Sequence, residues 1–337
     1  MTQEQRSHTR PSSRSCDGRA RPDAPSSVGA FKLALRNYAF VDYASQVYTA
    51  LILLVVLLFH GDRVPGWPFL VAAHAVSLVL VHSLIHLQAA RPENKALDWI
   101  RNFYPLGLYI GVYRETAMLN HIFVPGFLDP WFIHWEAKLF GGQPSLTFMR
   151  SLPWLPVSEI FYGSYFSYYF MLAGVGIALF RRNREWFRHY VSVMSFLFYV
   201  CCAIYICTPV VGPPIWFEEI PGYHLPADAI PADLSFPQAV TAGPFYQIMA
   251  FIYRNLEGPG GSFPSTHVAM ALCTLSFSFR YLRAIRWPHM VLVTLLCMST
   301  VYCRYHYIID VVAGMLAVSI LIPLGNHLYF KYKGVKP

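Results

Sequence analysis

Stretches of about 20 apolar residues recur along most of this chain and restrict what it can fold into. A helix of that length crosses the hydrocarbon core of a bilayer. Hydrophobic residues make up 55% of the 337 residues and charged residues only 13%, about half the charged share of a soluble domain. We therefore predict an all-α fold, a polytopic transmembrane helical bundle with about eight membrane helices. The approximate spans are residues 42–60, 67–88, 100–118, 157–180, 189–210, 264–283, 288–304 and 306–329.

The beginning of the chain has a different composition. Residues 1–30 are polar and carry five arginines among serines and prolines. Such a segment cannot bury enough apolar area to offset its chain entropy. We predict a disordered basic N-terminal arm over residues 1–30, followed by one membrane domain over residues 31–337 that carries its chemical motifs between residues 258 and 310.

Lysine and arginine concentrate in alternate loops, which predicts the orientation of the bundle. The arm, the loops after the second, fourth and sixth spans, and the last residues are rich in them. The positive-inside rule then places both termini in the cytoplasm and the loops 119–156 and 211–263 outside. The net charge of +8 is explained by this orientation signal, and we expect no nucleic-acid partner. Residues 129–136 in the first outer loop are typical of an interfacial helix anchored by Trp131 and Trp135, with Asp129 organising the loop.

Seven cysteines are scattered mostly through the apolar spans, without a disulfide framework or metal-ligand spacing. We interpret them as small apolar side chains that fill the interior. No histidine and carboxylate set shows the spacing of a zinc site either. We expect neither a metal nor another cofactor.

Two short motifs place ionisable residues at the ends of apolar spans, where such residues are costly and by default functional. One is residues 261–267 (Gly-Ser-Phe-Pro-Ser-Thr-His), and the other is residues 304–310 (Arg-Tyr-His-Tyr-Ile-Ile-Asp). A proline in the first motif favours the start of a helix, whose unpaired N–H groups attract a phosphate. Gly261 allows the backbone to approach an anion, and Thr266 lies in the first helical turn.

The second motif has the spacing of an activated nucleophile. His306 and Asp310 are four residues apart, so they share one face of a helix. A carboxylate behind an imidazole holds its tautomer and leaves the other ring nitrogen free to attack. Arg304 offers a planar donor fork to phosphate oxygens, although it could instead extend to the membrane surface. With His267 as the acid for the leaving oxygen, these residues predict an in-line phosphoryl transfer.

The two motifs resemble those of the type 2 phosphatidic acid phosphatase superfamily. Its Pro-Ser-x-His motif is similar to residues 264–267, and its third motif, which ends in His and, four residues later, Asp, is similar to residues 299–310. The resemblance implies a six-helix membrane core, a phosphohistidine intermediate and no required metal. It also implies that His306 is the nucleophile, Asp310 its orienting partner, His267 the general acid and Ser265 a phosphate ligand. Ser265 could equally serve as a helix cap.

Two departures from the family pattern change the expectations. Ser299 and Thr300 replace the usual Ser-Arg pair, and the basic residue stands instead at Arg304, which is similar to the inositol phosphorylceramide synthase branch of inositolphosphotransferases. The usual first motif, with its Lys and Arg, is missing from residues 205–217. Arg254 and Arg114 are the candidates to complete the phosphate site.

These observations predict a membrane phosphotransferase that acts on a lipid phosphate or phospho-head-group at the outer leaflet. One alternative is a lipid phosphate phosphatase that releases free phosphate. A second alternative is a non-catalytic membrane transport or lipid-binding protein, and a haloperoxidase with the same type of site is a third. The expected partner is a membrane lipid, and the sequence does not indicate an oligomeric state.

Overall fold

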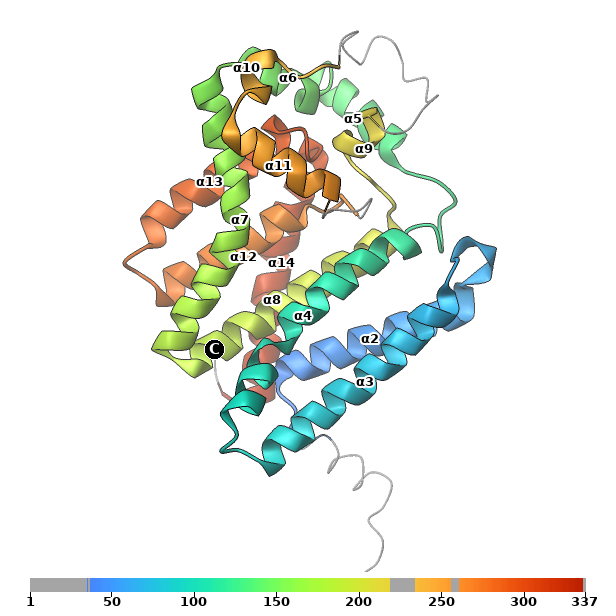
Figure 1. The fold of residues 1–337 in the computed structure, drawn as a ribbon, viewed down its shortest axis with the longest axis vertical. Helices are drawn as coiled ribbons and strands as arrows, with labels where there is room; N and C mark the ends of the chain where they lie inside the picture. Colours follow the sequence, from blue (N-terminus) through green and yellow to red (C-terminus); the bar gives the residue numbers. More distant parts are fainter. Residues whose placement is uncertain (1–34, 36, 219–233, 256–260, 336–337) are drawn as a thin grey trace, which may run out of the picture. The chain divides into compact units, whose positions relative to one another are not determined.

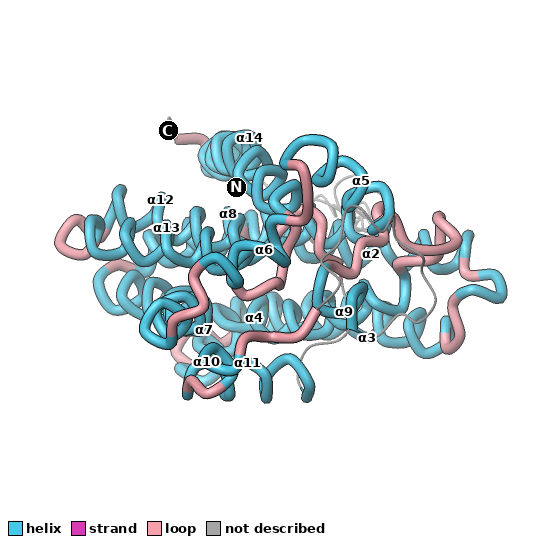
Figure 2. The backbone as a smooth tube through the Cα atoms, turned by 90° about the horizontal axis from the view of Figure 1, so that it is seen from above, coloured by secondary structure: helices cyan, strands magenta, loops and turns pink. Residues whose placement is uncertain are grey.

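The computed structural model describes residues 35, 37–218, 234–255 and 261–335. The predicted disordered arm lies outside these residues, and so do Gly258, Gly260 and part of the loop 211–263. Residues 38–337 form one compact unit. Its described residues form helices, turns and loops but no strand (Figure 2), which confirms the predicted all-α class.

The unit contains long helices and a set of short ones (Figure 1). The long helices are α2 (Phe40–Phe59), α3 (Trp67–Ala90), α4 (Lys95–Leu119), α7 (Leu155–Arg182), α8 (Arg184–Cys207), α12 (Thr266–Tyr281), α13 (Arg286–Tyr302) and α14 (Ile308–Lys333). The short ones are α5 (Asp129–Phe140), α6 (Pro144–Ser151), α9 (Pro213–Glu218), α10 (Gln238–Thr241) and α11 (Pro244–Asn255), with a 3-10 turn at Gly61–Arg63.

Five of the long helices are long and apolar enough to cross a membrane, which supports an integral membrane protein. These are α2, α3, α7, α8 and α14. The third predicted span forms the 25-residue helix α4, which carries five charged residues. Helices α12 and α13 have 16 and 17 residues and are only about 24 and 26 Å long. Crossing by these three helices stays a prediction.

Short polar side chains set several helix boundaries. The Asn94 side chain accepts hydrogen bonds from the N–H groups of Ala96 and Leu97 at the start of α4. Asn183 separates α7 from α8 and accepts from the N–H groups of Glu185 and Trp186. Each cap satisfies donors that a helix leaves unpaired at its N-terminus. The turns from α3 to α4 and from α7 to α8 are therefore short, and the helices that they join pack side by side.

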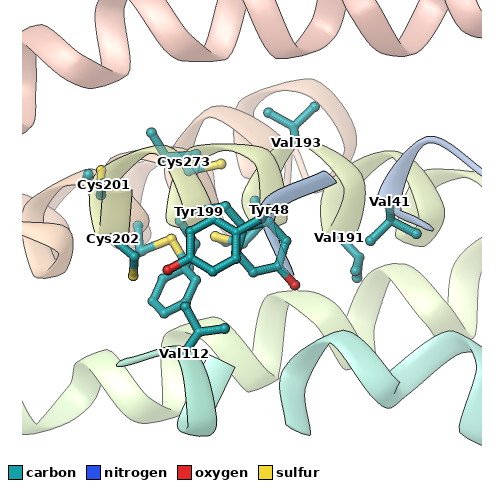
Figure 3. Packing of buried hydrophobic residues seen from close by; sticks show 14 of the residues in the cluster. Val41, Tyr48, Val112, Val191, Val193, Tyr199, Cys201, Cys202 and Cys273 are labelled. Carbon is teal, nitrogen blue, oxygen red and sulfur yellow. The ribbon is translucent and has the colours of Figure 1, made fainter. Parts of the chain in front are cut away.

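Helix α8 lies at the centre of the bundle and packs against α2, α4, α7, α12 and α14. Most of its side chains are buried. In the main core, Tyr48 of α2 stacks on Tyr199 of α8 with ring centroids 4.8 Å apart, and Cys201, Cys202 and Cys273 fill the space beside them (Figure 3). Among the cysteines of the described residues only Cys207 is exposed, in agreement with their predicted filling role.

Buried polar contacts connect α4 to α2 and α3. Asp42 of α2 pairs with Arg101 and accepts a hydrogen bond from Tyr104 at 2.6 Å. Glu115 pairs with His74 of α3 at 3.1 Å. Charges removed from water are tolerated only when they are paired and hydrogen-bonded, so these contacts hold α4 in one position beside α8.

The short helices gather at one end of the bundle (Figure 1). Helices α10 and α11 pack on α7, α6 packs on α13, and α5 packs on α14. Both motifs lie at this end, at the start of α12 and at the start of α14. Gly314 allows these two helices to cross closely, because a Cβ there would lie 2.7 Å from the carbonyl oxygen of Ser265.

Candidate active site

The two predicted motifs converge through backbone hydrogen bonds. The N–H of Ser265 donates to the carbonyl of Asp310 at 3.0 Å, which joins the start of α12 to the first turn of α14. The N–H of Ser262 donates to the carbonyl of Val210 at 2.7 Å and so fixes the first motif to the segment that follows α8. The N–H groups of Tyr305 and His306 both donate to Thr300 at 2.9 Å. The side chains of both motifs are therefore held by a rigid backbone.

His306 is held by Asp310 and by a hydroxyl that the sequence patterns do not single out. The Nδ1 atom of His306 lies 3.3 Å from Asp310 Oδ2 and 2.9 Å from Ser262 Oγ. Ser262 donates its single proton to Asp310 Oδ2 at 2.6 Å. The bond between Ser262 and His306 then requires the proton on Nδ1 of the imidazole. This tautomer leaves a lone pair on Nε2, the nitrogen that a nucleophile needs.

The imidazole of His306 is neutral as well as oriented. Its side chain is 5% exposed, and burial lowers the pKa of His306 to about 3. A protonated imidazole has no lone pair on Nε2, so the lowered pKa keeps the ring nucleophilic at neutral pH.

His267 faces the nucleophilic nitrogen. Its Nδ1 lies 3.4 Å from His306 Nε2, and its Nε2 lies 3.0 Å from the hydroxyl of Tyr165 on α7. Because Nε2 of His306 carries a lone pair, the proton of His267 belongs on Nδ1, and Tyr165 donates to the other nitrogen. The ring of Tyr168 lies against the same imidazole, at 4.6 Å between centroids. His267 thus directs its Nδ1–H toward Nε2 of His306.

Three of the residues predicted to bind phosphate have other contacts here. The Ser265 side chain caps α12 by accepting from the N–H of Val268, as in the alternative reading. The hydroxyl of Thr266 accepts from Tyr205 at 2.9 Å. Gly261 lies against the same tyrosine, and a Cβ there would be 2.1 Å from Tyr205 Cγ. These residues shape the start of α12, where the N–H groups of Ser265 and Thr266 already donate to the carbonyl of Asp310 and the hydroxyl of Tyr205.

Arg304 lies beside the two histidines, and its guanidinium donates hydrogen bonds to backbone carbonyls nearby. It has a φ of 62°, and its Nη1 donates to the carbonyl of Leu234 at 2.6 Å. The guanidinium also covers the ring of Phe236 at 4.3 Å. The arginine is buried with the site, and neither of these contacts leads it to the membrane surface.

A cavity of about 430 Å³ connects the predicted residues. His267, His306, Ser262, Arg304 and Arg254 all line it, together with tyrosines of α7 and α11. Arg254 therefore joins the two histidines, whereas Arg114 lines a second, separate cavity that also touches His267. Within the described ranges, no three His, Cys, Asp or Glu side chains gather as a metal site.

Two carboxylates of α5 bind the backbone segments that carry the site. Asp129 accepts hydrogen bonds from the N–H groups of Val211 and Gly212, at 3.0 and 2.9 Å, and from the hydroxyl of Tyr307 at 3.0 Å. Glu136 accepts from the N–H groups of Ile308 and Ile309 at the start of α14. The segment that lacks the family's basic first motif is thus anchored through its backbone. The sequence pointed to Asp129 as a loop organiser but gave no signal for Glu136.

Glu136 predicts a pH dependence of stability. Burial raises its pKa from 4.5 to about 7, against the lowering effect of the N–H groups of Ile309 and Ile308. Between these two values the folded protein binds the proton more tightly than the unfolded chain, so stability falls as the pH rises through this window. Glu136→Gln keeps an acceptor oxygen and removes the titration. The free energy of unfolding, measured in detergent, should fall across this window in the wild type. We expect the fall to be smaller in the variant by on the order of 1–3 kcal/mol.

The matched control for that measurement is Glu93→Gln, because Glu93 is exposed in the turn before α4. Its curve of unfolding free energy against pH should follow that of the wild type. Superimposable curves for Glu136→Gln and the wild type would contradict the assignment.

Comparison with known proteins identifies one family. A family model described as the PAP2 superfamily matches residues 130–324, which is more than half of the chain. No curated protein and no solved structure matches the chain. The matched segment begins in α5 and ends in α14, so it contains both histidines, Asp310 and Ser262, and leaves α2, α3 and α4 outside.

Proposed function

The chain belongs to the PAP2 superfamily, and from this premise we propose that it is a membrane phosphotransferase that acts on lipid phosphates or phospho-head-groups through a phosphohistidine at His306. Membership in the superfamily supports a phosphatase-type enzyme in general. The observation that carries the finer proposal is the unbroken hydrogen-bonded line from Asp310 through Ser262 and His306 to His267. It supplies an oriented nucleophile and, opposite it, a proton donor.

In the first step, the Nε2 lone pair of His306 attacks the phosphorus of the donor lipid. A P–N bond forms, the bond between phosphorus and the leaving oxygen breaks, and His267 gives its Nδ1 proton to that oxygen. In the second step, the hydroxyl of an acceptor attacks the phosphorus, its proton passes to His267, and the P–N bond breaks. Asp310 and Ser262 hold the Nδ1 proton of His306 throughout and stabilise the charge on its ring.

An in-line transfer places phosphorus between the nucleophile and the acid. In this structure the two imidazoles are in contact at 3.4 Å. The phosphoryl group therefore enters by separating the two rings, through a rotation of the His267 side chain, which packs against Tyr165 and Tyr168, while the start of α12 stays bonded to α14.

Arg254 is our candidate for the positive charge that the missing first motif would supply. It lines the cavity of the two histidines from α11, whereas residues 205–217 contain no lysine or arginine. Arg304 lines the same cavity and can contribute its charge at short range. Arg114 lines the second cavity and not that of the two histidines, so we assign it no contact with the phosphorus.

Transfer to a lipid hydroxyl is proposed in preference to hydrolysis because the site is shielded from water. The side chains of His306, His267 and Arg304 are 5%, 8% and 4% exposed. We also propose that the site opens on the non-cytoplasmic side. The arginine-rich turns after α7 and α12 lie at the ends of those helices that point away from the motifs, and the positive-inside rule assigns such turns to the cytoplasm.

The deciding experiment follows labelled phosphorus. Purified protein is incubated with phosphatidic acid or phosphatidylinositol that carries radioactive phosphate, with ceramide present as acceptor, and is quenched in alkali. We expect an alkali-stable, acid-labile label on the protein and transfer of the label to ceramide. Release of free phosphate alone would leave the phosphohistidine step intact and replace the transferase by a phosphatase. Absence of both label and turnover with either donor would favour the non-catalytic alternative.

Ser262 provides a test of the hydrogen-bonded line from Asp310 through Ser262 to His306. Ser262→Ala removes the bridge between His306 and Asp310 and leaves their direct contact of 3.3 Å. We expect kcat to fall about 10–100-fold with little change in KM, because the tautomer of the nucleophile is less well held. The matched control is Ser319→Ala, since Ser319 is exposed on the same helix as Asp310 and bonds only to nearby carbonyls. An unchanged kcat in Ser262→Ala would remove this residue from the mechanism.

A further inference from the structure

A second, larger cavity adjoins the site and differs from it in chemistry. It has a volume of about 820 Å³ and lies between α4, α7 and α8, with α12 at one end. Its lining is mainly aliphatic and aromatic. Tyr113 and His267 line both this cavity and the polar one, so the general acid candidate stands at the boundary between them. Volumes in this range accommodate drug-sized or lipid-sized apolar ligands.

The polar atoms of two lining tyrosines are already paired. The hydroxyl of Tyr109 lies 2.7 Å from Ser195 Oγ, and the hydroxyl of Tyr190 donates to the carbonyl of Leu172 at 3.1 Å. These tyrosines therefore offer a ligand the faces of their rings. Because most of the lining is apolar, an occupant of this cavity is held mainly by apolar burial, and Arg114 and His267 are ionisable residues of the lining.

The length of the cavity matches one leaflet of a bilayer. It begins at Tyr113 and His267 and ends where Phe103 meets Phe180 and Phe187, with ring centroids 5.0 and 5.1 Å apart. Along α4 this distance is ten residues, or about 15 Å. The hydrocarbon core of a bilayer is about 30 Å thick, so one leaflet contributes about 15 Å. A lipid chain that starts beside His267 fits this length in an extended form.

The cavity is open on the side that a bilayer would cover. Ile110 of α4 and Phe170 of α7 line it and are 67% and 64% exposed. Helix α7 is one of the helices suited to cross a membrane. Helices α4 and α7 each pack on α8, and the opening lies between them. A hydrocarbon chain can therefore enter from the lipid phase without crossing water.

We propose that this cavity binds the hydrocarbon chain of the lipid whose phosphorus reacts at His306. This inference rests on the proposed function. It adds that the hydrocarbon chain of the substrate is what the second cavity selects. One wall is α4, which lies outside the segment shared with the family, so the preference for chain length belongs to the additional helices of this protein. Phosphate in the polar cavity and hydrocarbon in the apolar one place the scissile bond at the boundary where His267 stands.

The test fills the cavity and compares substrates. Ala173 of α7 lines the cavity, and Ala173→Trp places an indole in it. We expect the ratio of kcat/KM for dipalmitoyl phosphatidic acid to that for para-nitrophenyl phosphate to fall about tenfold or more, because the long chain loses its buried surface. Ala72→Trp on the exposed face of α3 is the matched control and should leave the ratio unchanged. An unchanged ratio in Ala173→Trp would overturn the proposal.

A second measurement does not depend on turnover. Phosphatidic acid with a photoreactive diazirine at the end of its acyl chain is bound to the wild-type protein and irradiated. Labelled peptides from α4 and α7 would support the proposal, even if neither substrate is turned over and the proposed function fails. Labelling confined to α2 and α3, or to a second copy of the chain, would overturn it.

Discussion

Replacing His306 by alanine is expected to lower kcat by roughly 10⁴–10⁶-fold, to the background rate. The imidazole supplies the only Nε2 lone pair that Asp310 and Ser262 orient toward the cavity. Of the other described side chains in that cavity, His267 has its proton on the facing nitrogen and cannot attack. The measurement is turnover of labelled phosphatidic acid together with the amount of phosphohistidine trapped on the protein.

The control for this variant is His327→Ala. His327 lies exposed near the far end of α14, so the substitution changes the same residue type on the neighbouring helix without touching the site. Unfolding midpoints of both variants in detergent should stay close to that of the wild type. Retention of a trapped phosphohistidine in His306→Ala would assign the nucleophile elsewhere.

His267→Ala is expected to produce the second largest effect, about 10²–10⁴-fold on kcat for lipid substrates. An alkoxide is a poor leaving group and needs the proton that His267 carries on Nδ1. A nitrophenolate leaves without that proton, so para-nitrophenyl phosphate should be turned over with a much smaller loss. The experiment compares the two substrate classes in the variant and in the wild type.

The companion variant is Tyr165→Phe, which removes the hydroxyl that bonds His267 Nε2 at 3.0 Å. It should reproduce the same preference for good leaving groups in milder form, because the acid remains but its tautomer is less well held. Equal losses for both substrate classes in His267→Ala would assign this histidine to binding rather than to proton transfer.

Local spacing is what made much of the fold and site predictable. The apolar spans correspond to long helices because each residue of a bilayer-spanning helix faces lipid or apolar side chains. His306 and Asp310 were expected on one helical face, but His306 lies in the turn before α14, which begins at Ile308. The two side chains still lie 3.3 Å apart. The start of α12 at Thr266 follows from the capping serine, Ser265, whereas the proline that was expected in the first helical turn lies before the cap.

Contacts between segments that are distant in the sequence could not be predicted from local sequence patterns. Ser262 is an ordinary serine in a loop, and its role depends on a bond to Asp310, 48 residues away. The direction of the Arg304 side chain depends on the carbonyl of Leu234, which no local rule predicts.

The support that α5 gives to α14 has a consequence for biosynthesis. Asp129 is separated by 178 residues from its partner Tyr307, and Glu136 by 172 from Ile308. At about 5–20 residues per second, the ribosome needs roughly 10–35 s to make the chain between them. During that interval Asp129 and Glu136 have left the ribosome, but helix α14, which carries their partners, has not. The proposed centre therefore cannot assemble in the nascent polypeptide until the final helix is inserted.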